Sequence, residues 1–192
     1  MTVRPDECII GFGIPLSEEA FRRQAENPNG GDFIRSQNLT WPEYRWVFAD
    51  PCQNILPHLR AWGVGIVEGL TLQTLGGIFS KPPRTIILFA HWSSDGRIEL
   101  TDGLVSSEQV VSVVPNDFAG IMDLCVCHPR RLVELLKQKC PDCLVKFTDT
   151  EATPLWWIYL YTAMFKILLT QPDYFQALAD AFESLNQPER LK

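Results

Sequence analysis

The sequence reads R-T-I-I-L-F-A-H-W from Arg84 to Trp92 and G-I-M-D-L-C-V-C-H-P from Gly120 to Pro129. Each stretch is a short apolar run; the first ends at His91 and the second at Cys127. Such runs, bounded by polar or turn residues, are typical of strands buried on both faces of a parallel sheet. Because the carboxyl ends of neighbouring strands in an open α/β sheet meet at one crevice, we expect His91 and Cys127 to lie side by side. That is the arrangement of a base and a nucleophile in covalent catalysis.

The segments around these two runs alternate between strand and helix patterns. Apolar runs predict further strands at residues 7–14, 64–67 and 144–147. Helices are predicted from Ser17 (as N-cap) onward and at residues 50–62 (with Asp50 as N-cap), 71–79, 106–114, 129–139, 153–169 and 173–185. This alternation predicts an α/β fold with a mostly parallel sheet.

Three segments lie outside that alternation or at its end. Residues 15–49 are a predicted insertion or irregular N-terminal segment, because Trp41, Tyr44 and Trp46 follow no clean period. After His91, two Asp-Gly dipeptides at 95–96 and 102–103 predict a small β-ribbon over the top of the sheet. The last helix is expected to be amphipathic, with one apolar face formed by Phe175, Leu178, Ala179 and Phe182.

Composition limits the classes of function. A chain of 192 residues with 46% hydrophobic residues can bury one substantial core, so a single domain over residues 1–192 is expected. The net charge of −6 and the pI near 5.1 argue against binding to nucleic acid or to an anionic membrane, which requires a dense basic face.

The expected compartment is the cytoplasm. Charged residues and a proline precede the first apolar run, which is unlike a signal peptide. The most apolar stretch, Leu155–Leu169, is shorter than the about 20 residues of a membrane span. Six cysteines without a secretory signal predict free thiols in a reducing compartment.

A zinc site is the main metal alternative, because C-x-C-H at Cys125–His128 is followed by C-x-x-C at Cys140–Cys143. A helix of about 11 residues, roughly 16 Å long, separates the two pairs. A βαβ crossover would place them at opposite ends of the sheet. We therefore interpret the cysteines at 140 and 143 as structural and expect no metal.

Cys125 and Cys127 lie two residues apart on one predicted strand, so periodicity cannot separate them. Position along the strand favours Cys127, because His128-Pro129 ends the strand and a helix N-terminus lowers the pKa of a nearby thiol. Cys125 is expected one pleat deeper, in an apolar setting that keeps it protonated.

The order of these elements resembles that of the caspase-like peptidases, the clan of caspases, metacaspases and CHAT domains. The run I-I-L-F-A-H-W looks like their strand ending in His-Gly, and D-L-C-V-C-H-P looks like the strand carrying the nucleophilic cysteine. The pair Cys127-His128 is similar to the C-H step after the metacaspase nucleophile. The segment V-K-F-T-D-T-E-A-T-P before an aromatic helix is similar to the end of CHAT domains.

This resemblance implies a caspase-like three-layer sandwich and a cysteine endopeptidase that needs no cofactor. Cys127 would attack the scissile carbonyl, His91 would serve as acid and base, and the backbone N–H groups of Trp92 and Cys127 would bind the oxyanion. Cys125 and Asp149 are the candidate contacts to substrate. The expected context is a regulated bacterial defence or signalling complex with a protein substrate and a regulatory protein partner.

Two positions depart from the family pattern. Trp92 stands where the family has glycine after the histidine, and Cys125 stands where metacaspases have an acidic residue. The second change removes support for basic P1 specificity. The first leaves an alternative open, in which the chain is a catalytically inactive caspase-like module that binds a partner protein.

Overall fold

A five-stranded sheet, with all strands parallel, forms the centre of the molecule in the computed structural model, which describes residues 1–93, 95–148 and 154–186. Its strands, in spatial order, are β2 (Gly65–Glu68), β1 (Cys8–Phe12), β3 (Thr85–Phe89), β7 (Ile121–Cys125) and β8 (Leu144–Lys146). The predicted pairing is confirmed, because β3 and β7 are adjacent and parallel, with Phe89 opposite Cys125.

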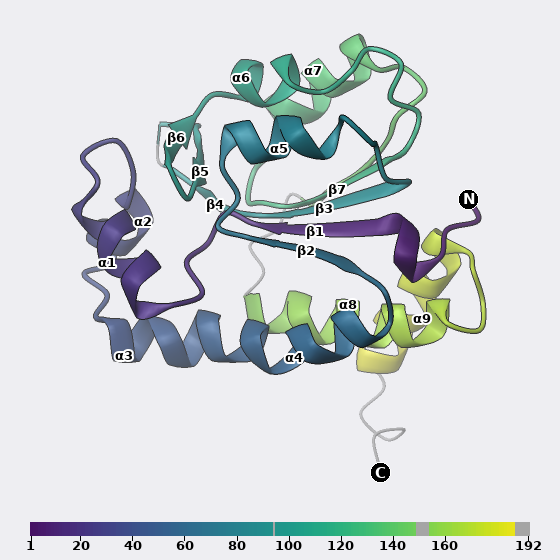
Figure 1. Cartoon of the computed structure of the whole chain (residues 1–192), viewed down its shortest axis with the longest axis horizontal. Coiled ribbons are helices and arrows are strands. Elements are labelled where there is room, and N and C mark those ends of the chain that lie inside the picture. Colours follow the sequence, from purple (N-terminus) through teal and green to yellow (C-terminus); the bar gives the residue numbers. More distant parts are fainter. Residues whose placement is uncertain (94, 149–153, 187–192) are drawn as a thin grey trace.

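Helices cover both faces of this sheet (Figure 1). One face carries α5 (Leu72–Ile78), α6 (Ser107–Ser112) and α7 (Arg130–Lys139), and the other carries α4 (Asp50–Ala61), α8 (Pro154–Leu168) and α9 (Tyr174–Asn186). A short 3-10 turn, η1 (Pro5–Glu7), precedes β1. The predicted α/β class with a parallel central sheet and three layers is therefore confirmed.

The two helical layers explain why the strands are apolar throughout. In β3, Ile87 and Phe89 pack into the core beneath α4 and α8, whereas Ile86 and Leu88 pack into the core beneath α5, α6 and α7. All five residues of β3 are buried. Strands buried on both faces lose the alternation of apolar and polar residues.

The predicted N-cap is confirmed at Ser17 and is wrong at Asp50, and Ser106 caps the helix predicted at residues 106–114. The hydroxyl groups of Ser17 and Ser106 accept hydrogen bonds from the backbone N–H of Ala20 and Gln109. The prediction of Asp50 as an N-cap is wrong, although α4 does begin at this residue. The chain is already helical through α3 (Trp41–Tyr44) and the π-helix η2 (Arg45–Ala49), which run directly into α4, and the Asp50 carboxylate instead accepts a hydrogen bond from Arg45.

The N-terminal segment before this helix contains two short helices, α1 (Glu18–Glu26) and α2 (Asp32–Ser36). Phe21 and Ile34 of these helices join Tyr44 and Phe48 of the following helix in a separate small core cluster. The irregular period of the sequence arises from this succession of short helices. They lie beyond the carboxyl end of the sheet, at the left of Figure 1.

The predicted β-ribbon is present at the same end of the sheet. It has three antiparallel strands, β4 (His91–Trp92), β5 (Ile98–Leu100) and β6 (Gly103–Val105). The glycines of the two Asp-Gly dipeptides have φ values of 84° and 142°, which explains why glycine occupies both turns.

The predicted apolar face of α9 is wrong. Phe175 and Phe182 are 38% and 49% exposed, whereas Tyr174, Ala177 and Ala181 form the buried stripe. The small side chains of Ala177 and Ala181 allow α9 to pack closely on α8, and of the predicted face only Leu178 packs against the core. Within the described ranges, no helix has the length and apolar character needed to cross a membrane.

Candidate functional site at the carboxyl ends of β3 and β7

His91 lies two residues beyond the end of β3. The expectation that the strand itself ends at His91 needs correction, because β3 stops at Phe89 and His91 opens β4 of the ribbon, opposite Glu99. The residue is half-buried, and its Nε2 atom is shielded from solvent without a hydrogen-bond partner.

Aromatic side chains surround the His91 ring. Phe33 of α2 stacks on it with ring centroids 3.8 Å apart and planes 11° apart. Phe48 meets it edge-on at 5.5 Å, and Tyr44 does so at 6.4 Å. Burial in this setting disfavours the charged imidazolium and lowers the pKa of His91 from 6.5 to about 3.

Cys127 lies two residues beyond the end of β7. The predicted strand reaches Cys127, but the observed strand ends at Cys125 and residues 126–128 form a bend before α7. The Cys127 thiol is half-buried and not in a disulfide. His128, the next residue, has a φ of +51°, a left-handed conformation that is uncommon outside glycine and that clusters at functional turns.

The two candidate residues leave neighbouring strands at equivalent positions. Phe89 is opposite Cys125 in the β3–β7 register, so His91 and Cys127 each follow that pair by two residues. Phe89 and Cys125 also belong to the same core layer, on the side of α4 and α8. The structure thus brings both residues to one edge of the sheet, as the sequence predicts.

Cys125 lies in the interior rather than in a surface groove. Its thiol donates a hydrogen bond to the Tyr161 hydroxyl at 3.1 Å, and burial raises the pKa of Cys125 well above that of an ordinary thiol. A substrate does not reach this side chain in the structure. Asp149, the other candidate substrate contact, lies outside the described residues.

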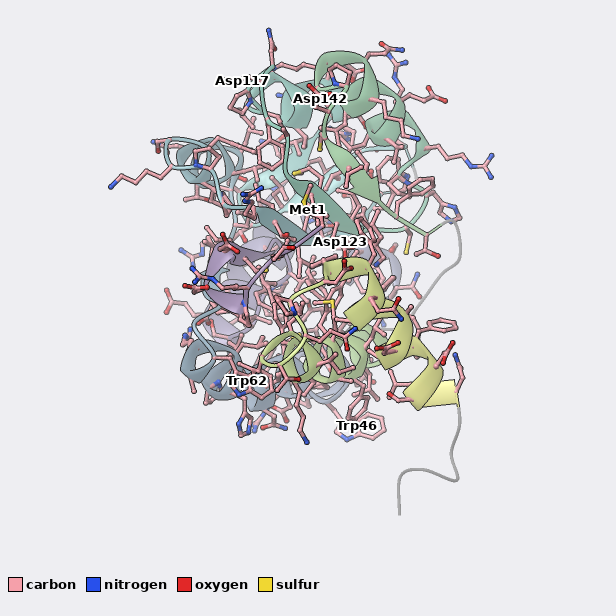
Figure 2. All side chains as sticks on the ribbon, turned by 90° about the vertical axis from the view of Figure 1, so that its right-hand side faces the viewer. Met1, Trp46, Trp62, Asp117, Asp123 and Asp142 are labelled. Carbon is pink, nitrogen blue, oxygen red and sulfur yellow. The ribbon has the colours of Figure 1, made fainter. Side chains whose placement is uncertain are left out.

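A buried polar network continues from Cys125. The Lys146 ammonium donates to the Tyr161 hydroxyl at 3.0 Å and lies 2.9 Å from Oδ1 of Asp123, an ion pair without hydrogen-bond geometry. The Tyr174 hydroxyl donates to Oδ2 of Asp123 at 2.7 Å. Asp123 is fully buried, and Figure 2 shows it between the helical layers, far from Trp46 at the outer surface.

Trp92, the candidate oxyanion donor, lies in β4 opposite Ile98. Ser93 donates its backbone N–H to the carbonyl of Arg97, which makes the 93–97 pair a hydrogen-bonded one. Because such pairs alternate along an antiparallel ladder, the N–H of Trp92 points away from β5. Its backbone is ordinary, since the described non-glycine residues with positive φ are Asn38 and His128.

The two cysteine pairs of the zinc alternative are far apart in the fold. Cys127 follows the carboxyl end of β7, whereas Cys140 and Cys143 precede the amino end of the parallel neighbour β8. The Cys140 thiol donates to the carbonyl of Pro115 at 3.1 Å. Among the described residues, no group of three or more histidine, cysteine or acidic side chains is placed to bind one metal ion.

Sequence reasoning missed Glu99, which is fully buried beside His91. Its Oε1 accepts hydrogen bonds from Gln24 Nε2 at 2.8 Å and from the N–H of Gly31 at 2.6 Å, and its Oε2 accepts one from the N–H of Phe33 at 3.1 Å. In the sequence, a single glutamate between Ile98 and Leu100 predicts a ribbon strand with Glu99 on the side exposed to solvent. No local signal shows that the N-terminal segment covers that face.

Comparisons with protein-family models, with curated proteins and with solved structures found no match to the chain.

Proposed function

We propose that the chain is a cysteine endopeptidase of the caspase-like group, with Cys127 as nucleophile and His91 as acid and base. The observation that carries the proposal is the register of β3 and β7. It sets His91 and Cys127 two residues beyond a directly paired Phe89 and Cys125, at the carboxyl edge of a parallel sheet. Ligands of open α/β sheets bind at this edge.

The proposed reaction uses groups of the chain alone. The Cys127 thiolate attacks the scissile carbonyl, and the resulting tetrahedral oxyanion accepts hydrogen bonds from backbone N–H groups. The Trp92 N–H suits this role because it points away from β5. His91 takes the Cys127 thiol proton, gives it to the leaving amine and then takes a proton from the water that hydrolyses the thioester, which releases the Cys127 sulfur. The mechanism requires no cofactor.

Resemblance supplies the rest of the proposal. The order of the strand ending near histidine, the ribbon, the strand ending near cysteine and the long aromatic helix is similar to that of CHAT domains. On this basis we propose a protein substrate, a cytoplasmic location, and a regulatory protein partner in a bacterial defence or signalling complex.

A second candidate is a catalytically inactive caspase-like module that binds a partner protein. The state of His91 favours it. With Nε2 shielded and the pKa lowered to about 3, the ring stays neutral near pH 7 and is a poor acceptor for a thiol proton.

Labelling with a peptide chloromethylketone distinguishes these functions. If the protein is a peptidase, we expect alkylation at Cys127 and cleavage of a peptide library. Cys127→Ala should abolish both. Cys125→Ala should retain most of the labelling and most of the cleavage, because the buried Cys125 thiol of the unmodified protein has a raised pKa and is not the nucleophile.

Cys52→Ala, which changes a fully buried thiol, is the matched control. Labelling that remains after Cys127→Ala and disappears after Cys125→Ala would identify Cys125, one pleat deeper in the strand, as the nucleophile. Labelling at none of the cysteines, both in the intact chain and in Phe33→Ala, which removes the ring stacked on His91, would favour the inactive module.

A further inference from the structure

The His91 ring has a cover made by a different part of the chain. Phe33 lies flat against it at 3.8 Å, and Phe33 belongs to α2, more than fifty residues earlier in the sequence. Phe48 and Tyr44 flank the ring, but they belong to the helix that continues into α4. The side chain that can leave without disturbing the central layers is therefore Phe33, together with α1 and α2.

Glu99 attaches this segment to the ribbon. All three of its hydrogen-bond donors, the Gln24 side chain and the N–H groups of Gly31 and Phe33, lie in residues 24–33. An ionised carboxylate in the interior is strongly unfavourable without such donors. Glu99 is also the cross-strand partner of His91, so one residue pair of the ribbon carries both the covered imidazole and the attachment point of its cover.

Residues with a left-handed backbone lie at both ends of α2. Gly31 has a φ of 73°, and a Cβ there would lie 2.3 Å from the Gln24 carbonyl oxygen, so the turn into α2 requires glycine. At the far end, Asn38 has a φ of 48°, which ends α2 sharply before α3. Apart from those to Glu99, three hydrogen bonds join the segment to the ribbon. Leu104 N–H donates to the Asn29 carbonyl, the Asn27 side chain donates to the Asp102 carbonyl, and Gln24 Nε2 donates to the Leu100 carbonyl.

We propose that residues 18–36, helices α1 and α2, are an autoinhibitory cover over His91, and that Glu99 is the latch that keeps it closed. The inference rests in part on the proposed peptidase function, because it assigns a regulation to that site. With the cover in place, Phe33 occupies one face of the imidazole and Nε2 is shielded. When the cover leaves, the ring meets solvent and can exchange protons with a thiol.

Hydrogen exchange of the unmodified protein is the first test. We expect the Phe33 amide, corrected for its intrinsic rate, to exchange at least about tenfold faster than the Ile87 amide of the central strand, because the cover opens below the global unfolding free energy. Equal protection of the two amides would mean that the segment opens only when the whole domain unfolds, and the proposal would be wrong.

Two variants test the latch and the cover separately. Glu99→Gln replaces charge-assisted hydrogen bonds with neutral ones, so exchange at Gly31 and Phe33 should rise about 10- to 100-fold. Phe33→Ala removes the stacked ring and should raise the rate of His91 modification by diethyl pyrocarbonate about tenfold or more. The exposed His58 provides the internal reference in each sample.

Glu43→Gln is the matched control, because Glu43 caps α3 in the neighbouring turn through Thr40 and is exposed. It should leave both rates within about twofold of the unmodified protein, as surface substitutions usually do. If Glu99→Gln and Phe33→Ala behave like Glu43→Gln, the cover proposal is overturned. Protection of Ile87 in the same samples reports whether a variant has lost its fold.

Peptidase assays separate this proposal from the proposed function. Faster exchange of the cover and faster modification of His91, joined by new labelling at Cys127, support both. The same changes without labelling or cleavage support the cover and contradict the peptidase. Labelling of Cys127 in the unmodified protein at the rate of both variants supports the peptidase and overturns the cover.

Discussion

His91 is a histidine whose chemistry is set by its surroundings rather than by its position in the strand order. Burial lowers its pKa from 6.5 to about 3. Between these two pH values, His91 is protonated in the unfolded chain and neutral in the folded one. The stability contributed by the neutral ring is therefore complete above pH 6.5 and is lost as the pH falls. The expected slope is at most about 1.4 kcal/mol per pH unit below pH 6.5.

The substitution His91→Gln tests this, because it removes the titrating group. Urea unfolding at several values from pH 7.5 to pH 5 should show a smaller loss of stability in the variant than in the unmodified protein. His58→Gln, at an exposed histidine, is the control and should keep the steeper dependence. Parallel pH profiles for the unmodified protein and His91→Gln would show that His91 titrates normally in the folded state.

At the same scale, the sequence predicts that His91 and Cys127 follow neighbouring strands at one edge of the sheet, but it does not predict the protonation state of His91. Both residues follow buried apolar runs, and the parallel pairing of β3 with β7 puts the ends of these runs at the same edge of the sheet. The ring of Phe33 reaches His91 through a segment whose docking is non-local, and the same segment supplies the hydrogen-bond donors to Glu99. Long-range contacts of this kind leave no local pattern, so the low pKa was not predictable.

At the scale of single elements, a buried ion pair joins Asp123 of β7 to Lys146 of β8. Asp123 is fully buried and the Lys146 side chain is 16% exposed. Lys146 also lies over the Trp157 ring, 4.1 Å from its centroid. Removing one partner of a buried pair leaves an uncompensated charge, whereas replacing both partners is often nearly neutral.

We therefore expect Lys146→Met to lower the free energy of unfolding by about 3–5 kcal/mol, and Asp123→Asn added to it to restore a substantial part of the loss. The exposed pair of Arg131 and Glu108 offers a control, since Arg131→Met should cost no more than about 1 kcal/mol. Urea unfolding of the single and double variants measures the coupling. Strictly additive effects would show that the two charges do not stabilise each other.

Elements also show where local signals mislead. Asp50-Pro51 has the residues of a helix start, yet the helix begins earlier and passes through a π-helical turn at residues 45–49. In α9 the two phenylalanines suggest a buried face, yet the alanines are buried. In both cases packing against neighbouring helices overrides the preference of a few residues.

For the whole molecule, the parallel sheet and the pairing of β3 with β7 were predictable because strand and helix patterns alternate along the chain. The order of the other strands was not predicted. The site at the carboxyl edge followed from the parallel topology. The cover did not, because it depends on how a third, small core cluster docks onto the ribbon.

The last prediction concerns whether residues 1–192 form one cooperative domain. Ile87 and Leu88 are adjacent on β3, both fully buried, but they face the two different layers of the core. If the central sheet couples both layers, Ile87→Ala and Leu88→Ala should each lower the unfolding free energy by about 2–5 kcal/mol in a single transition. Leu169→Ala, at a half-exposed leucine, should cost no more than about 0.5 kcal/mol. Circular dichroism and tryptophan fluorescence should give coincident urea midpoints in every variant, and separate midpoints that respond to only one of the two substitutions would divide the chain into two folding units.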